Sequence, residues 1–111
     1  MEYKYNQKMA IVRLLLDIIS IDEKIDERET LYFEKIKKEL NLSPEDHFKV
    51  KDFSTLLSLS ILKDMTEEQK ESYASLMKNM ILADGIIEPS ELIAYKDICQ
   101  FCDIRTKDID V

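Results

Sequence analysis

The sequence predicts an all-α fold in a single domain of about five to seven helices, spanning residues 1–111. The chain has 111 residues, enough to enclose a hydrophobic core of its own. It contains one glycine and two prolines, too few for the many tight turns of a sheet protein. Leucine, isoleucine, lysine and glutamate dominate the composition, and all but isoleucine rank high in helix propensity.

The charge and the N-terminal segment exclude several functional classes. The net charge of −7 argues against nucleic-acid binding, because the phosphate backbone would be repelled. The first residues are polar and aromatic, and the apolar segment after them carries Arg13 and Asp17, which does not resemble a signal peptide. No apolar segment has transmembrane length, so we expect no direct membrane insertion. With two cysteines and no export signal, a cytoplasmic location without disulfides is expected.

The first predicted helix, Tyr5 to Ile21, is apolar on almost every side. Such a helix is either central and covered by its neighbours or a surface helix with a partner. Packing inside the domain is the simpler interpretation, and a homodimer formed through this helix is the alternative to a monomer. The aromatic N-terminus, with Tyr3 and Tyr5, admits the same two interpretations: it packs back on the domain or docks a partner.

A second helix is predicted from about Asp26 to Leu40. Asp26 is a favoured N-cap residue, and Glu29 three positions later completes a capping-box pattern. Asn41 is a residue often found just beyond a helix C-terminus. Four apolar positions of this segment are expected to be buried: Leu31, Phe33, Ile36 and Leu40.

The remaining helices are indicated by capping residues, by proline in a first turn and by apolar spacing. They are predicted at about 43–50, 53–62, 66–81 and 88–102, with Ser43, Thr66 and Glu88 opening the first, third and last of them. Gln69 stands in the reciprocal position of the Thr66 cap, and Thr106 is a candidate cap for a final turn.

The chain contains an internal repeat in which Asp84 lies 62 positions after Asp22. At this spacing acidic residues align with acidic ones and apolar residues with apolar ones. The aligned pairs are Asp22/Asp84, Ile25/Ile87, Asp26/Glu88, Glu29/Glu91, Leu31/Ile93, Phe33/Tyr95, Ile36/Ile98, Leu40/Cys102 and Leu42/Ile104. The pattern predicts a duplicated helix–acidic loop–helix unit, at about residues 9–42 and 71–104, arranged about a pseudo-twofold axis.

The loop of the second copy, Leu82-Ala83-Asp84-Gly85-Ile86-Ile87-Glu88-Pro89-Ser90-Glu91, resembles the signature of the TerB-like family of tellurite-resistance proteins and DnaJ-like membrane co-chaperones. Residues 21–29 form a degenerate first copy that lacks the glycine, so the resemblance covers nearly the whole chain. It implies an all-α domain, a divalent-cation site at the acidic loops, and a link to metal stress and envelope-associated complexes. It implies no established enzymatic activity.

Six acids of the two loops are the candidate metal ligands: Asp22, Asp26, Glu29, Asp84, Glu88 and Glu91. If the loops lie together, these carboxylates could converge on a hard divalent cation such as calcium, magnesium or manganese, which prefers several oxygen ligands. A cation would also neutralise carboxylates that otherwise repel one another. The loops are not EF-hands, because the twelve-residue ligand spacing is absent.

Helix capping explains most of the same acids without a metal. Four of the six stand at N-cap or capping-box positions, and acids in a first turn also interact favourably with the helix dipole. Asp22 and Asp84 instead end the preceding helices, where a negative charge is unfavourable. Caps alone, or a weak cation site in addition to the caps, therefore both remain open.

The two cysteines have the spacing C-x-x-C, which is half of a tetrahedral zinc site. No second pair exists, His47 is the only histidine, and the βαβ context of a redox motif is absent. Cys102 aligns with Leu40 and is expected to be a core thiol, whereas Cys99 aligns with Lys37 and is expected to be partly exposed. Structural cysteines are therefore the favoured interpretation.

The other charged residues carry no evident site. The second helix has a charged face that is interpreted as solvated, formed by Glu34, Lys35, Lys37, Lys38 and Glu39. His47 is interpreted as a surface histidine rather than a catalytic base. The sequence thus predicts a non-enzymatic module that binds a protein partner. A metal-ion-binding stress-response protein and a helical dimerisation scaffold are the alternatives.

Overall fold

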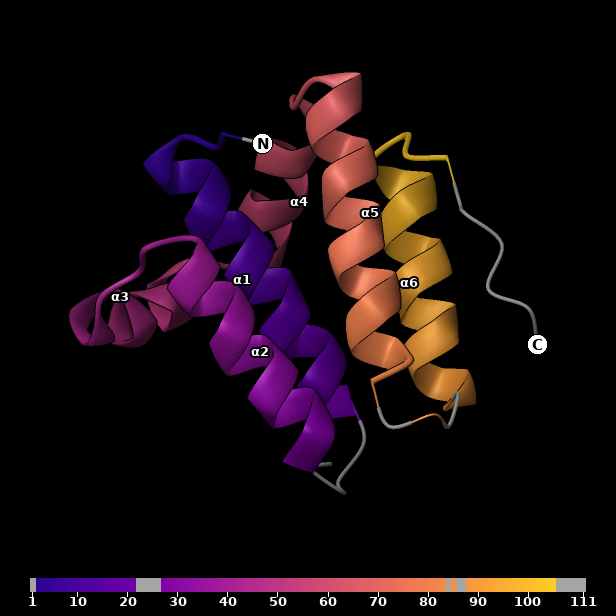
Figure 1. The fold of residues 1–111 in the computed structure, drawn as a ribbon. Helices are drawn as coiled ribbons and strands as arrows, with labels where there is room; N and C mark the ends of the chain where they lie inside the picture. Colours follow the sequence, from indigo (N-terminus) through magenta and orange to yellow (C-terminus); the bar gives the residue numbers. More distant parts are fainter. Residues whose placement is uncertain (1, 22–26, 84, 86–87, 106–111) are drawn as a thin grey trace.

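The computed structural model describes residues 2–21, 27–83, 85 and 88–105, and within them the predicted all-α fold is confirmed (Figure 1). These residues form helices α1 (Tyr5–Ile21), α2 (Glu27–Glu39), α3 (Pro44–Lys49), the short 3-10 helix η1 (Val50–Asp52), α4 (Thr55–Lys63), α5 (Glu67–Ile81) and α6 (Pro89–Phe101).

Four of these helices form an antiparallel bundle. Each packs on two others, in the cyclic order α1, α2, α5, α6, so that the hairpin α1–α2 faces the hairpin α5–α6. In Figure 1 α1 and α5 run downward, and α2 and α6 return upward. Helix α4 packs along α1 and also meets α6, while η1 packs on α1. If α1 exchanged places with α5, and α2 with α6, the same four pairs of helices would be in contact.

Helix α1 occupies the centre of the molecule, and the domain itself covers most of its apolar surface. Its bounds are those expected from the sequence. Helices α2, α4 and α6 pack against it from different sides, which explains why almost every side of it is apolar. Its buried residues are Met9, Ala10, Ile11, Val12, Leu14, Leu15, Ile18 and Ile19. Ile21, in its last turn, is 44% exposed.

Helices α2 and α6 end in the same backbone structure, 62 residues apart. Asn41, with φ of 58°, follows α2, and the N–H of Leu42 donates to the carbonyl of Lys37 at 3.1 Å. Asp103, with φ of 57°, follows α6, and the N–H of Ile104 donates to a carbonyl in the last turn at 2.8 Å. These bonds define a Schellman motif, in which a left-handed residue satisfies the last carbonyls of the helix.

Burial also matches between the aligned helices. Buried residues align with buried residues in Glu29/Glu91, Phe33/Tyr95 and Leu40/Cys102, and exposed ones align in Leu31/Ile93. The prediction that Leu31 is buried is wrong, because its side chain is 64% exposed. Leu31 lies two positions from both Glu29 and Phe33, and two positions along a helix turn a side chain to nearly the opposite side.

The predicted caps of α3 and α5 are confirmed. Ser43 and Thr66 each accept a hydrogen bond from a first-turn N–H, and Gln69 completes the capping box of Thr66. Helix α4 begins two residues later than predicted. Ser54 caps it by accepting from the N–H of Leu57 at 3.0 Å, which leaves Phe53 extended. The predicted Thr106 cap lies outside the described residues.

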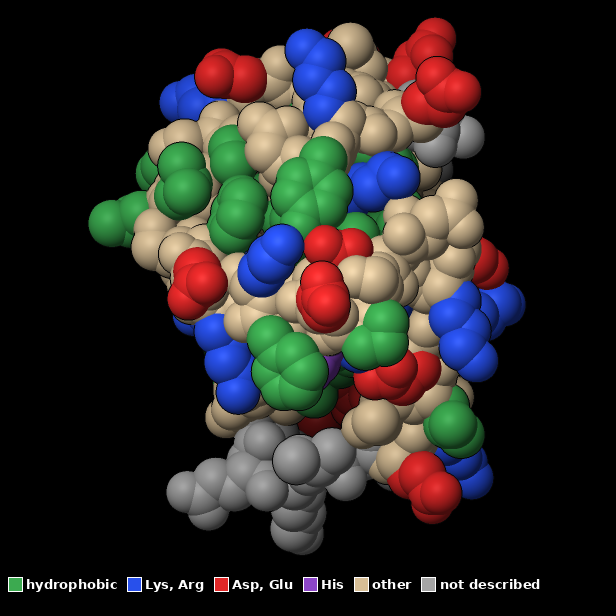
Figure 2. All heavy atoms as spheres, turned by 90° about the vertical axis from the view of Figure 1, so that its left-hand side faces the viewer, with side chains coloured by type: hydrophobic (Ala, Val, Ile, Leu, Met, Phe, Trp, Pro, Cys, Tyr) green, Lys and Arg blue, Asp and Glu red, His purple; other side chains and the backbone are tan. Residues whose placement is uncertain are grey.

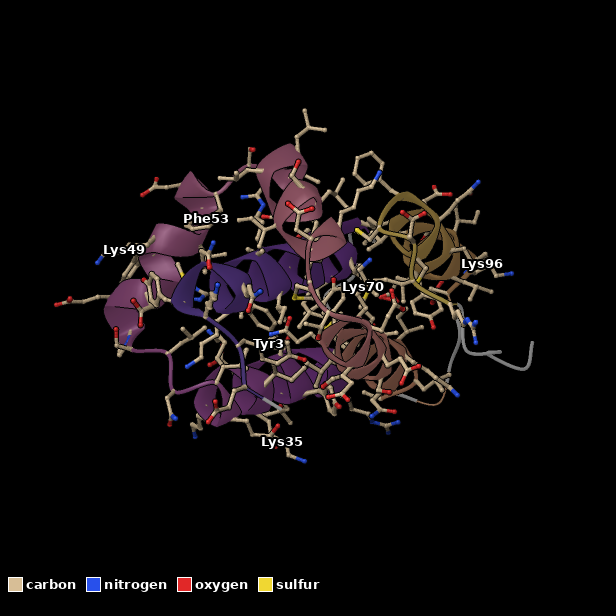
Figure 3. The ribbon with its side chains drawn as sticks, turned by 90° about the horizontal axis from the view of Figure 1, so that it is seen from above. Tyr3, Lys35, Lys49, Phe53, Lys70 and Lys96 are labelled. Carbon is tan, nitrogen blue, oxygen red and sulfur yellow. The ribbon has the colours of Figure 1, made fainter. Side chains whose placement is uncertain are left out.

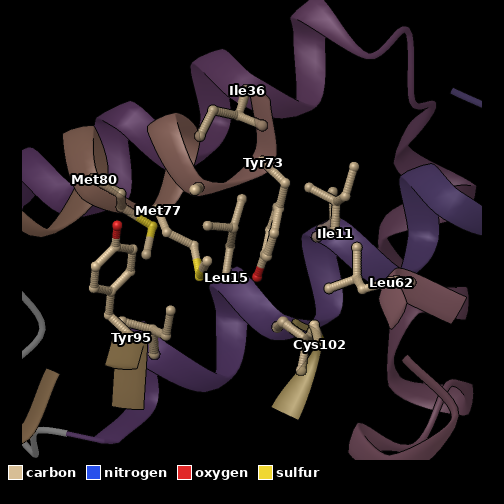
Figure 4. Close-up of a cluster of buried hydrophobic side chains, with 14 of the residues drawn as sticks. Ile11, Leu15, Ile36, Leu62, Tyr73, Met77, Met80, Tyr95 and Cys102 are labelled. Atoms are coloured by element: carbon tan, nitrogen blue, oxygen red, sulfur yellow. The ribbon is translucent and has the colours of Figure 1, made fainter. Parts of the chain in front are cut away.

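The centre of the core contains an aromatic residue whose polar atom is enclosed. Tyr73 is fully buried among Ile11, Leu15 and Leu62, and its ring points toward Cys102 (Figure 4). Among the described residues, its hydroxyl has no hydrogen-bond partner. Burial raises the pKa of Tyr73 well above its ordinary value, because the phenolate would be desolvated.

Replacing Tyr73 by phenylalanine is expected to raise the free energy of unfolding by about 1 kcal/mol, since it removes an enclosed, unsatisfied polar group. Urea unfolding followed by circular dichroism measures the change. Tyr95→Phe is the matched control, because Tyr95 is also buried but its hydroxyl is not left without a partner. That variant should lose stability, so equal losses in both variants would contradict the prediction.

Candidate functional site

Three of the six predicted metal ligands, Glu29, Glu88 and Glu91, lie among the described residues. Asp22, Asp26 and Asp84 lie outside the described residues. Glu29 and Glu91 lie in the first turns of α2 and α6, where their side chains are almost fully buried. These two helices begin at the same end of the bundle (Figure 1). The described residues contain no group of three or more histidine, cysteine or acidic side chains placed to hold a metal ion. A shared cation site therefore stays a prediction.

Glu88 occupies the N-cap position of α6, as predicted, but its side chain does not cap the helix. Its backbone is extended, with φ of −80° and ψ of 124°, and its carboxylate accepts no first-turn N–H. Glutamate is one methylene longer than aspartate, and longer still than serine, and these shorter side chains are the ones that reach the first-turn amides well. Pro89 follows at the first helical position, where the missing N–H needs no partner.

Both cysteines are free thiols in the core. Cys102 is fully buried, as predicted, and its Sγ lies 3.5 Å from the carbonyl oxygen of Leu59. Cys99 is also fully buried, so the prediction that it is partly exposed is wrong. It aligns with Lys37, which is itself only 8% exposed. Burial raises the pKa of each thiol to about 11, because a thiolate would be desolvated.

The interpretation of the charged face of α2 as fully solvated is also wrong. Lys35 points outward (Figure 3), but Lys37 is buried. Lys37 lies one turn after Phe33 and two turns after Glu29, on the same side of α2, so its aliphatic stem packs on the domain. Its ammonium lies 4.9 Å from the centre of the Phe33 ring, a cation–π contact.

An apolar groove opens between α1, α4 and α6, with a volume of about 320 Å³. Successive turns of each helix supply its walls, because residues three or four positions apart share a helix face. Its lining residues are Leu14, Asp17, Ile18, Ile21, Thr55, Leu59, Ala94, Asp97 and Ile98. Sequence reasoning missed this groove because the residues come from three separate helices and meet only through the packing of α4 on α1 and α6.

The charged residues that line the groove are both acidic. The carboxylate of Asp17 is held in place by Arg13, at 3.2 Å from Nε, and by Thr55, whose hydroxyl donates at 2.8 Å. Asp97, on α6, is exposed. Ile93 lies one turn before Asp97 on α6 and is 59% exposed, so it extends the apolar surface beside the groove. The result is an apolar floor with carboxylates beside it.

No protein-family model matches the sequence, and no curated protein matches it. Among solved structures, the chain is similar to the crystal structure of a protein of unknown function from Porphyromonas gingivalis W83. The TM-score is 0.79 with 19% sequence identity, over 96% of this chain and 90% of that one. None of the described helices combines the length and apolar character needed to span a bilayer. At 19% identity the similarity shows the fold alone.

Proposed function

We propose that this chain is a non-enzymatic, TerB-like binding module that docks a basic amphipathic helix of a partner protein in the groove between α1, α4 and α6. The observation that carries the proposal is the character of the groove, an apolar floor whose charged residues, Asp17 and Asp97, are both acidic. Most of its lining residues are apolar, as in surfaces that bind an amphipathic helix.

The lining of the groove is of the kind that binds an amphipathic helix. Helices are recognised by grooves that accept apolar residues three or four positions apart, and this groove offers apolar walls on three helices. Ile21 and Ile93 are 44% and 59% exposed, and a partner would bury them. Covering exposed apolar surface is the main driving force for such docking.

The charges of the groove favour a basic partner. The chain carries a net charge of −7, and the exposed Asp97 would pair with lysine or arginine on the polar margin of a helix, whereas Asp17 is already paired with Arg13. Electrostatic complementarity of this kind accelerates association and rejects acidic competitors. The amphipathic helix is therefore expected to carry positive charge beside its apolar face.

The test uses two synthetic probe peptides, each an amphipathic helix of about four turns of leucine with lysine or of leucine with glutamate. Chemical shifts of the ¹⁵N-labelled protein are followed during titration. The lysine peptide is expected to shift signals of Ile18, Leu59 and Ala94, and the glutamate peptide to bind at least about tenfold more weakly.

A pair of variants separates groove binding from general attraction to an acidic protein. Ala94→Arg places a bulky cation in the groove and should abolish binding of the lysine peptide. Asn79→Arg makes the same charge change at an exposed position of α5, which does not line the groove, and should leave binding nearly unchanged. Equal binding to both variants, or equal binding of both peptides, would refute the proposal.

A further inference from the structure

A second pocket, independent of the groove, lies where α2 meets the segment leading into α3. Its volume is about 450 Å³, within the range of ~300–1,000 Å³ typical of small-molecule sites. Its lining residues are Glu34, Lys37, Lys38, Leu42, Ser43, Pro44, His47 and Phe48. Figure 2 shows the histidine (purple) almost hidden behind hydrophobic side chains (green).

The polar side of this pocket is an organised network around the buried Lys37. Its ammonium donates to the Glu34 carboxylate at 2.8 Å and lies 2.9 Å from Nδ1 of His47. A lysine ammonium can only donate, so the ring nitrogen Nδ1 of His47 can take part in this bond only as an acceptor. The ring of Phe33 contacts the same ammonium, which is therefore fixed in position from three sides.

The remaining walls are apolar and partly exposed. Leu42 and Pro44 line the pocket, and Phe48 beside them is 73% exposed. The rings of Phe48 and His47 meet edge to face, with their centres 5.9 Å apart. An occupant with an apolar body would cover Phe48 and remove its surface from water.

The charge of the lining selects an anion. Two lysines and one glutamate leave an excess of positive charge, on a protein whose net charge is −7. We propose that this pocket binds a small amphiphilic carboxylate, with its apolar body against Leu42, Pro44 and Phe48 and its charge on Lys37.

Glu34 already shows how Lys37 receives a carboxylate. The Glu34 side chain is 50% exposed, whereas that of Lys37 is 11% exposed, so the anion is the partner that can move away. An incoming carboxylate would replace one carboxylate on the ammonium by another, so the buried charge of Lys37 stays paired throughout the exchange. Glu34 thus competes with the ligand for the ammonium.

The probes are octanoate, octanol and octylammonium, which share a chain and differ in charge. His47 is the only histidine, so its ring protons give a single resolved set of signals inside the pocket. Octanoate is expected to shift these signals and those of the Leu42 methyl groups at neutral pH. Octanol is expected to bind at least about tenfold more weakly, and octylammonium more weakly still.

Two substitutions should act in opposite directions. Glu34→Gln removes the internal competitor and should tighten octanoate binding by about two- to fivefold. Lys37→Met keeps the aliphatic stem and should remove the preference for octanoate over octanol. If that variant does not fold, Glu34→Gln and the comparison of the three probes still test whether the pocket binds a carboxylate.

Matched controls lie on the same helix. Lys35→Met and Glu39→Gln make the same charge changes at a pair that faces solvent and does not line the pocket. Both should leave octanoate binding nearly unchanged. The proposal is overturned if octanol binds as tightly as octanoate, if Glu34→Gln weakens binding, or if Lys35→Met has the effect expected of Lys37→Met.

Discussion

Replacing Leu15 by alanine is expected to lower the free energy of unfolding by about 3–5 kcal/mol, the range of a large cavity in a core that cannot close around it. Leu15 is fully buried in the middle of α1, next to Tyr73 and Met77 (Figure 4). Because α1 is packed by α2, α4 and α6, no neighbour can move inward without losing contacts elsewhere. Chemical denaturation followed by circular dichroism measures the loss.

The control for this substitution is the same change at the surface. Leu56, on α4, is 73% exposed, and Leu56→Ala should change stability by no more than ~0.5 kcal/mol. Domains of this size have a free energy of unfolding of only ~5–15 kcal/mol, so the Leu15 variant should unfold at a clearly lower temperature than the parent protein. A loss below ~1 kcal/mol at Leu15 would mean that α1 is not the centre of the core.

The second large effect concerns the thiols of Cys99 and Cys102. The thiolate is the reactive form, and burial raises the pKa of both groups to about 11. At mildly alkaline pH the thiolate fraction is therefore roughly a hundredfold below that of an ordinary cysteine, whose pKa is ~8.5. Reaction with a disulfide reagent should be slower by about that factor in the folded protein, and further slowed by burial.

The rate at which the two thiols react should also depend on pH in a specific way. A raised pKa keeps most of the thiol neutral at mildly alkaline pH, so reactivity should go on increasing with pH up to about 11, whereas that of an ordinary cysteine levels off above ~8.5. In urea both cysteines should react at the ordinary rate, which serves as the control. Rapid reaction of either cysteine in the folded protein would contradict the burial described for Cys99 and Cys102.

Much of the fold could be predicted from local signals. The length and all-round apolarity of 5–21 predicted α1 with its bounds, and the caps at Ser43 and Thr66 predicted the starts of α3 and α5. The spacing of 62 residues places α2 and α6 at equivalent positions, each 13 residues long. Capping and periodicity act within a few residues, so they are readable in the sequence itself.

The sides of α2 could not be assigned with the same certainty. Leu31 was expected inside and Lys37 outside, and the structure reverses both. Residue type predicts burial only on average. Lysine can bury its stem when its ammonium finds partners, as it does with Glu34 and His47. Glu34 lies one turn away on α2, and His47 lies on α3. Tertiary packing therefore determines whether Lys37 is buried.

The candidate sites depend on tertiary structure even more strongly. The groove combines residues from α1, α4 and α6. The pocket around Lys37 combines residues of α2 with α3 and the segment leading into it. Neither has a motif, because no fixed spacing in the sequence corresponds to positions brought together by helix packing.

The left-handed residues after α2 and α6 also affect the unfolded chain. Three residues with positive φ occur in the described part of the structure, and only Gly85 is a glycine; the others are Asn41 and Asp103. A side chain at such a position strains the folded backbone slightly, but it also reduces the conformations open to the unfolded chain. With a single glycine in the chain, the disordered state has less entropy to lose, and folding requires correspondingly less compensation from the core.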